Sequence, residues 1–166
     1  MSWRRFLLYV IYLPPGLIHG LPGFLLLLLF GHRFHWDKRG AFVFELRADS
    51  WFYNRFYKGW GGTTFGAVVM GRPGVSVSVL FHEFVHVEQV QAASLLGLVL
   101  GAAALALGFS FLSLWYALAI WLLLPSLQYV AAGTVAVLRG ESFYRGNSFE
   151  ESAYAQQDVE RQEPHT

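Results

Sequence analysis

Residues 82–86 read His-Glu-Phe-Val-His, and their types and spacing suit metal chemistry. On a helix, residues i and i+4 lie on one face, so His82 and His86 can hold one ion together. Glu83 lies about 100° around the helix, where it can act as a base toward a water at the ion without being a ligand. The flanking residues are strongly apolar, and buried ionisable groups are costly unless they are paired or bind metal. The pattern therefore predicts a zinc site with Glu83 as the catalytic base; a solvated or structurally satisfied helix face is the alternative.

A hydrolytic zinc site needs a third protein ligand and an open position. Glu150 is the best candidate for this ligand, and its neighbour Glu151 is the alternative. The chain has no cysteine, which excludes thiolate ligands and disulfides. An oxyanion formed on a substrate carbonyl would also need a hydrogen-bond donor, for which Tyr154 is the first candidate. The other candidates for this donor are Tyr144, His32 and His35.

The composition indicates that these residues belong to a membrane protein. Hydrophobic residues make up 55% of the chain and charged residues 14%, whereas soluble globular proteins carry about 25% charged residues. The formal net charge of +1 gives no electrostatic argument for nucleic acid as a partner. We therefore expect one membrane-embedded domain over residues 1–166, with the lipid bilayer as a partner.

About three membrane segments must position the site. Residues 6–30 carry no charge and are long enough to cross a bilayer. Pro14-Pro15-Gly16 interrupts this stretch, which predicts either a kinked anchor or a short interfacial helix followed by a re-entrant one. Residues 92–138 also carry no charge and predict a transmembrane hairpin that turns near residues 108–112. The helix with His82 should continue into this hairpin.

The predicted hairpin separates the histidines from Glu150 and returns the chain to the membrane face on which it started. All Lys and Arg residues except Arg4 and Arg5 fall on this face. Basic residues near membrane segments favour the cytoplasm. We therefore expect a multi-pass protein of the inner (plasma) membrane whose site faces the cytoplasm.

Residues 40–90 are expected to form a small sheet together with the zinc helix. Residues 41–46 and 63–70 are rich in β-forming residues and predict one strand each. Residues 51–60 carry several aromatic and basic side chains, which suit a strand or an interfacial helix. The edge of this sheet could bind an extended peptide, or the sheet could simply cover the helix. Residues 141–160 should form the helix of the third ligand and a polar tail.

His82-Glu83-Phe-Val-His86 followed by Glu150-Glu-Ser-Ala153 resembles the gluzincin metallopeptidases. The pattern is similar to that of the integral-membrane heat-shock protease and CAAX-prenyl-protease families, which also have a hairpin between the two parts. Small bacterial membrane proteins with a T-x-G strand, here Thr64 and Gly66, and a Gln after the motif, here Gln89 or Gln91, look similar as well. The resemblance covers roughly residues 63–155. It implies a zincin-like, minimal α+β catalytic part.

The chain departs from the membrane-protease families at Tyr154, where those proteins carry an Asp that orients a zinc histidine. A metal-bound imidazole usually donates its other N–H to a fixed acceptor. Asp158, Glu88 or a main-chain carbonyl would have to take this role here.

These observations predict a mainly α, multi-pass membrane protein with a small β-sheet packed by the helix of His82. We expect a membrane-bound zinc metallopeptidase that cleaves peptide or membrane-protein substrates at the bilayer surface. The alternative is a non-catalytic scaffold or assembly subunit of a membrane complex with a structural or vestigial zinc site. Glu83 distinguishes the two, because only the enzyme needs it.

Overall fold

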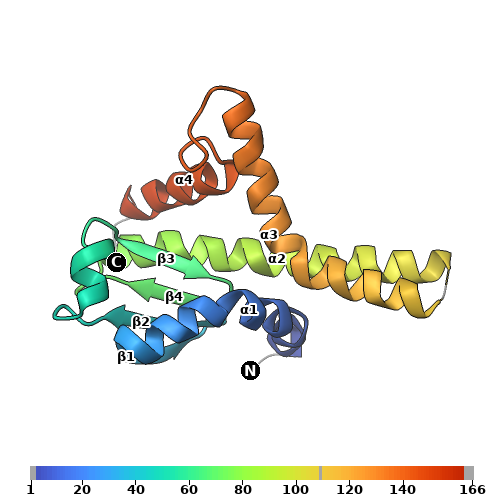
Figure 1. Cartoon of the computed structure of the whole chain (residues 1–166), viewed down its shortest axis with the longest axis horizontal. Helices are drawn as coiled ribbons and strands as arrows, with labels where there is room; N and C mark the ends of the chain where they lie inside the picture. The colour runs from blue at the N-terminus through green and yellow to red at the C-terminus, as the bar shows by residue number, and fades with distance from the viewer. Residues whose placement is uncertain (1–2, 109, 163–166) are drawn as a thin grey trace.

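The computed structural model describes residues 3–108 and 110–162 and is mainly helical (Figure 1). Three helices are long and apolar enough to cross a membrane, which agrees with the predicted number of membrane segments. A shorter fourth helix follows them, and a small sheet lies between the first and second helices in the sequence. The helices are α1 (Trp3–Phe30), α2 (Val77–Leu107), α3 (Phe111–Leu138) and α4 (Ser148–Gln162).

The sheet has four strands in the order β1-β2-β4-β3. β2 and β4 are parallel, and the two outer strands pair antiparallel to them. β3 is therefore an edge strand. The strands are β1 (Gly31–Asp37), β2 (Ala41–Leu46), β3 (Gly62–Phe65) and β4 (Val68–Gly71).

The strand predicted over residues 41–46 is confirmed as β2. The single strand predicted over residues 63–70 is wrong, because the chain reverses there and forms the β3–β4 hairpin. Gly66 makes this reversal possible: its φ of 54° lies in the left-handed region that favours glycine. β1, directly after α1, was not expected from the sequence.

Helices cover both faces of the sheet. Val43 and Val69 point to one face and are buried against Phe84 and Val87 of α2. Alternate residues of the same strands, among them Phe44, point to the other face and pack against α1. Successive strand residues point to opposite faces, so a sheet covered on both faces needs apolar residues at every position. This requirement explains why β4, and β2 apart from Glu45, consist of apolar residues and glycine.

α1 is one helix through Pro14, Pro15 and Pro22, so the predicted division of residues 6–30 into two helices is wrong. Its dark-blue first turns lie at an angle to the rest, which agrees with the alternative of a kinked helix (Figure 1). Proline has no N–H, so Pro15 leaves the carbonyl of Ile11 without its usual helical donor. Trp121 of α3 donates its indole N–H to this carbonyl over 3.2 Å. Partners from a neighbouring helix are one way in which a membrane helix tolerates proline.

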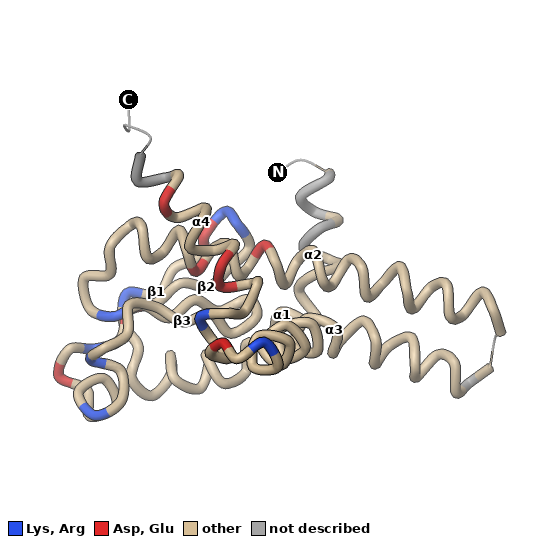
Figure 2. Tube along the Cα trace, turned by 90° about the horizontal axis from the view of Figure 1, so that it is seen from above, with Lys and Arg blue, Asp and Glu red and all other residues tan. Residues whose placement is uncertain are grey.

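α2 and α3 form the predicted hairpin. From residue 89 to the end of α3 the chain carries no Lys, Arg, Asp or Glu (Figure 2). Gly97 and Gly101 of α2 lie one turn apart against the α3 backbone. A Cβ at Gly101 would come within 2.9 Å of the carbonyl oxygen of Ala117. Such a spacing of small residues lets two membrane helices approach closely. α2 ends at Leu107 and α3 begins at Phe111, as expected for the turn, although Phe109 lies outside the described residues.

α3 follows α2 in its first half and then turns away from it (Figure 1). Pro125 lies inside α3, and proline is a common cause of helix kinks. The divergence of the two helices leaves room for α4 beside the first turns of α2.

Residues 51–60 adopt the helical alternative, with a π-helical segment, η1 (Tyr53–Tyr57). Trp51 and Phe56 are 65% and 56% exposed, which agrees with the interfacial helix that the sequence offered as one alternative.

Candidate metal centre

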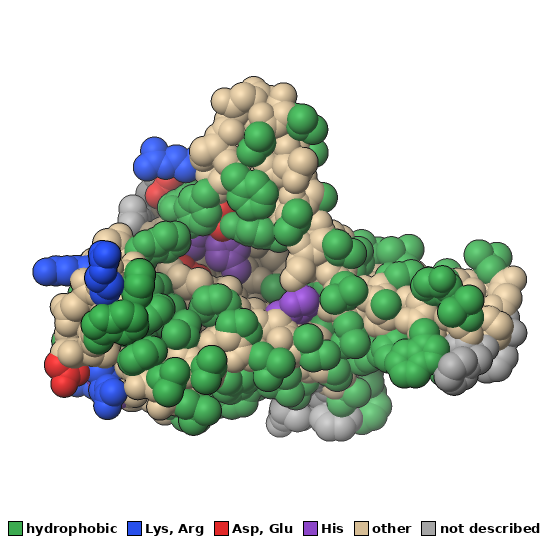
Figure 3. Space-filling view, in the orientation of Figure 1, with side chains coloured by type: hydrophobic (Ala, Val, Ile, Leu, Met, Phe, Trp, Pro, Cys, Tyr) green, Lys and Arg blue, Asp and Glu red, His purple; other side chains and the backbone are tan. Residues whose placement is uncertain are grey.

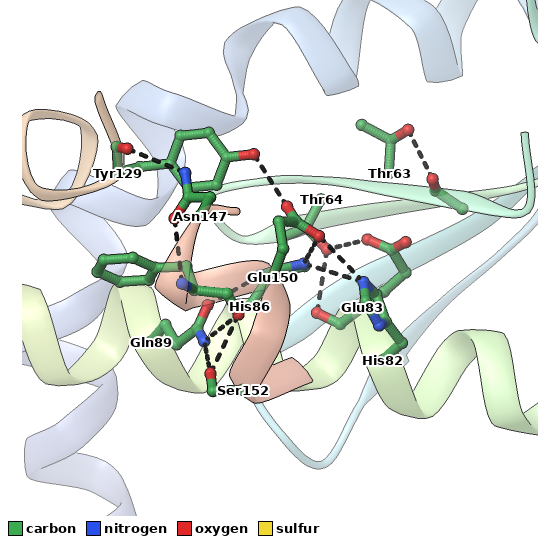
Figure 4. A network of polar contacts seen from close by, with 12 residues as sticks. Thr63, Thr64, His82, Glu83, His86, Gln89, Tyr129, Asn147, Glu150 and Ser152 are labelled. Carbon is green, nitrogen blue, oxygen red and sulfur yellow. Dashed lines mark hydrogen bonds and ion pairs between the residues drawn. The ribbon is translucent and has the colours of Figure 1, made fainter. Parts of the chain in front are cut away.

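The structure brings His82 and His86 of α2 together with Glu150 of α4 (Figure 4). The Nε2 atoms of the two histidines are 3.2 Å apart. Oε2 of Glu150 lies 3.4 Å from Nε2 of His82 and 3.3 Å from Nε2 of His86. These three atoms therefore form a nearly equilateral triangle. Glu151, the alternative ligand, is exposed on α4.

This triangle fits a small tetrahedral metal ion. Ligands that bind zinc at about 2.0–2.1 Å in a tetrahedron are about 3.3 Å from one another. His82 and Glu150 are only 5% and 3% exposed, and Oε2 of Glu150 is buried without a hydrogen bond from any described residue. A buried acceptor without a donor is costly, and a cation at the centre of the triangle would remove that cost. Three donors of this type suit zinc and other divalent transition metals.

Gln89 sets the protonation of His86. Its side-chain nitrogen donates to the main-chain oxygen of Phe149 over 2.9 Å, and this oxygen can only accept. The amide oxygen of Gln89 therefore faces Nδ1 of His86, 2.8 Å away, and Nδ1 must carry the proton. In neutral His86 the lone pair is then on Nε2, which points into the triangle. Gln89 thus takes the orienting role that the sequence assigned to Asp158, Glu88 or a carbonyl.

His82 lacks the corresponding support. Its Nδ1 is buried and has no hydrogen-bond partner among the described residues. The ring of Tyr154 packs against the His82 ring, with 4.5 Å between centroids. Tyr154 therefore contacts the site through its ring; its predicted role as an oxyanion donor remains a prediction.

Hydrogen bonds of Asn147 fix the position of Glu150 at the start of α4. Asn147 precedes α4, and its side-chain oxygen accepts a hydrogen bond from the main-chain N–H of Phe149 over 3.0 Å. This is helix N-capping, and it fixes the first turn, in which Glu150 lies. The side-chain nitrogen of Asn147 donates to the carbonyl of Tyr129 in α3 over 3.2 Å. Ala153, one turn after Glu150, is fully buried, so the small side chain allows α4 to lie close to its neighbours.

The Glu150 carboxylate is held in its ionised form. Burial by itself would raise its pKa, but the close contacts with the imidazoles of His82 and His86 and the hydrogen bond from Tyr129 hold the pKa well below its usual range. The Tyr129 hydroxyl donates to Oε1 over 2.9 Å, which leaves Oε2 to face the histidines.

Glu83 lies beside the triangle and is not part of it. The hydroxyl of Thr64 in β3 lies 2.8 Å from Oε2 of Glu83. Gly62, also in β3, lies directly against this carboxyl group: a Cβ there would come within 2.8 Å of Oε1 and 2.7 Å of Cγ. The edge strand therefore positions Glu83, and a side chain at residue 62 would push the carboxyl group away.

These groups line a cleft of about 450 Å³. The space-filling view shows it as a hollow between the sheet, α3 and α4, with histidine and acidic atoms inside a largely hydrophobic surface (Figure 3). The lining includes Glu83, His86, Glu150 and Tyr144. Burial, followed by hydrogen bonding with Tyr154, raises the pKa of the Tyr144 hydroxyl.

The remaining oxyanion candidates, His32 and His35, are on β1, at the other edge of the sheet from β3. Neither residue lines the cleft. His32 instead lies 3.1 Å from the carbonyl of Glu45 through Nδ1. The structure therefore does not bring these two residues to the candidate metal centre.

Comparisons with models of known protein families, with curated proteins and with solved structures gave no match for this chain.

Proposed function

We propose that this protein is a membrane-bound, zinc-dependent peptidase that hydrolyses peptide bonds at the membrane surface. The observation that carries the proposal is the convergence of three ligand atoms within 3.2–3.4 Å of one another, beside a carboxylate that is not a ligand. The three ligands belong to His82, His86 and Glu150, and the separate carboxylate is Glu83. The resemblance of these residues to gluzincin motifs supports the same proposal.

His82, His86 and Glu150 would hold the ion. A zinc ion held in this way supplies a Lewis acid and lowers the pKa of a water molecule to about 7. Two of the three proposed ligands, His86 and Glu150, line the cleft together with Glu83. A substrate carbonyl can therefore reach the ligand set from the cleft.

Glu83 is the residue that moves protons. As a general base it would accept a proton from the attacking water, and it would then pass this proton to the amine that leaves. Thr64 restrains Oε2 by a hydrogen bond, and the backbone at Gly62 limits the space around Oε1. The carboxyl group is thus restrained before substrate arrives, which reduces the entropic cost of the reaction.

Tyr144 is the best-placed donor for the oxyanion, because it lines the cleft together with Glu83 and Glu150. Tyr154 remains a second candidate, although its ring packs on His82.

The substrate would bind along β3. This strand pairs only with β4, so its outer edge has no strand neighbour among the described residues. Gly62 and Thr64 of β3 line the cleft, next to Glu83. An extended peptide can add to such an edge through main-chain hydrogen bonds. The basic residues on this side of the membrane segments favour a cytoplasmic site.

A second candidate function is a non-catalytic membrane scaffold with a structural metal site. One observation favours it: the buried Nδ1 of His82 has no partner in the described part of the chain. A metal-bound histidine almost always has such a partner, so its absence at His82 among the described residues favours a vestigial form of this site.

The deciding experiment uses the full-length protein in detergent micelles, loaded with zinc and incubated with a peptide library. We expect wild type to bind about one zinc per chain and to cleave peptides. Glu83→Gln should keep the zinc and lose cleavage, and His86→Ala should lose both. Glu88→Gln is the matched control, because Glu88 is an exposed residue of the same helix. Wild type that holds zinc and cleaves nothing would favour the scaffold.

A further inference from the structure

His19 of α1 and Ser126 of α3 form a polar pair between two apolar helices. Nε2 of His19 lies 2.7 Å from the main-chain oxygen of Leu122, which can only accept, so Nε2 carries the proton. In neutral His19, Nδ1 is then an acceptor, and the Ser126 hydroxyl donates to it over 3.0 Å. The direction of both hydrogen bonds is therefore set by the backbone of α3.

This pair lies in the same cleft as the candidate metal centre. His19 and Ser126 both line the cleft, together with Glu83 and His86. Ser126 is three residues before Tyr129, so the two share a face of α3. The Tyr129 hydroxyl contacts Glu150, a proposed ligand. Ser126 is therefore about one helical turn before Tyr129, the α3 residue that contacts the candidate metal centre.

The surroundings of the pair are apolar. Both residues lie inside helices that are apolar and long enough to cross a membrane. The cleft that contains the pair is also lined by Phe65, Val90 and Val130, among other apolar side chains. Its volume of about 450 Å³ falls within the range of roughly 300–1,000 Å³ that is usual for pockets that bind small ligands. A short apolar stretch of polypeptide fits such a space.

The pair offers the chemistry that an unwound peptide backbone needs. The oxygen of Ser126 keeps lone pairs that can accept a substrate N–H while its own proton is bound to His19. The same hydroxyl can also rotate and donate to a substrate carbonyl. A peptide group within an apolar cleft is costly unless it finds such a partner.

We propose that His19 and Ser126 form a second binding site in the cleft, which holds a main-chain peptide group of an apolar substrate segment a few residues from the scissile bond. Ser126 makes the contact, and His19 positions its hydroxyl. This inference rests on the proposed peptidase function and defines its substrate as an apolar, locally unwound segment.

Two metal-binding probes test the proposal on the zinc-loaded, full-length protein in detergent micelles. The short probe is acetohydroxamic acid, which reaches only the metal. The long probes are Leu-Ala oligopeptide hydroxamates, with the peptide placed on either side of the hydroxamate. We expect one long series to bind wild type more tightly than the short probe. Ser126→Ala should weaken that series about 3- to 10-fold, the usual effect of one hydrogen bond, and leave acetohydroxamic acid unchanged.

Two further variants complete the test. Ser126→Thr keeps the hydroxyl and should retain the affinity of wild type. Thr134→Val is the matched control, because the Thr134 hydroxyl bonds to Val130 of its own helix, 2.8 Å away, and does not line the cleft. The second site would be contradicted if Ser126→Ala and Thr134→Val changed the affinity for the long probes equally. It would also be contradicted if no long probe bound wild type more tightly than acetohydroxamic acid. Neither result would contradict the proposed peptidase function. Failure of every hydroxamate to bind the zinc-loaded protein would instead contradict the proposed function.

Discussion

Nδ1 of His86 lies 2.8 Å from the side-chain oxygen of Gln89, and the nitrogen of the same amide holds the backbone of α4. This nitrogen also lies 2.7 Å from the hydroxyl of Ser152. Gln89 therefore joins two of the proposed ligands: it orients His86 directly, and it fixes the turn of α4 that carries Glu150. The arrangement of the candidate metal centre therefore depends on the side chain of Gln89, although Gln89 is not one of the proposed ligands.

Replacement of Gln89 by Ala should weaken zinc binding. The change removes the acceptor for His86 and the donor to α4, and loss of such a supporting residue typically costs 10- to 100-fold in metal affinity. Competition with a fluorescent zinc chelator measures the effect. Gln156→Ala, an exposed residue of α4, is the control and should bind zinc as wild type does. Unchanged affinity in Gln89→Ala would show that His86 needs no such partner.

Gly62→Ala should lower the rate of peptide hydrolysis and leave zinc affinity unchanged. The new Cβ would come within 2.8 Å of Oε1 of Glu83, so the carboxyl group must move. A displacement of about 1 Å in a catalytic group can cost about 100-fold in rate. Gly59→Ala is the matched control, because a Cβ there meets nothing within 4 Å. Equal rates for the two variants would mean that the edge strand does not position Glu83.

Asn147→Ala should destabilise α4 and weaken zinc binding together. Loss of an N-cap side chain costs about 0.5–2 kcal/mol, and here the hydrogen bond to the carbonyl of Tyr129 is lost as well. Thermal unfolding with and without zinc measures both effects: the midpoint should fall, and the increase that zinc produces should shrink. Ser148→Ala changes an exposed neighbour and should change neither quantity. A normal zinc response in Asn147→Ala would contradict this account of how Glu150 is placed.

Gly101→Ala should destabilise the hairpin of α2 and α3 by about 1–3 kcal/mol, the usual cost of overpacking. Its Cβ would lie 2.9 Å from the carbonyl oxygen of Ala117, a backbone atom that cannot move aside alone. Unfolding of the protein in micelles by a denaturing detergent measures the change. Gly108→Ala, where a Cβ meets nothing within 4 Å, should be neutral. The same stability for both variants would exclude close packing at Gly101.

Several features of this protein followed from the sequence alone. The pairing of His82 and His86 depends only on the periodicity of one helix, and the α2–α3 hairpin depends only on a long uncharged stretch. Counting the predicted membrane crossings placed the candidate Glu150 on the same face as the histidines, because two crossings return the chain to the face on which it started. Such features are local or topological, so no knowledge of packing is needed to predict them.

Tertiary contacts decided the rest. Gln89 and Phe149 are 60 residues apart in the sequence, and nothing in either neighbourhood indicates that they bond. The spacing of Gln89 three residues after His86 was visible, but only the placement of α4 gave this spacing a function. Nothing in the sequence assigned a role at the candidate site to Gly62, and only the sheet brings it against Glu83.

α1 shows the same difference between what the local sequence determines and what tertiary contacts determine. Its prolines correctly indicated carbonyls without helical donors, and from this the sequence suggested a kink or a break. The helix does not break there, and Trp121 of α3 supplies a donor to Ile11 across 110 positions of the chain. Local sequence determined which groups needed partners; the packing of distant segments decided where those partners are, since a hydrogen bond depends on proximity in space and not on distance along the chain.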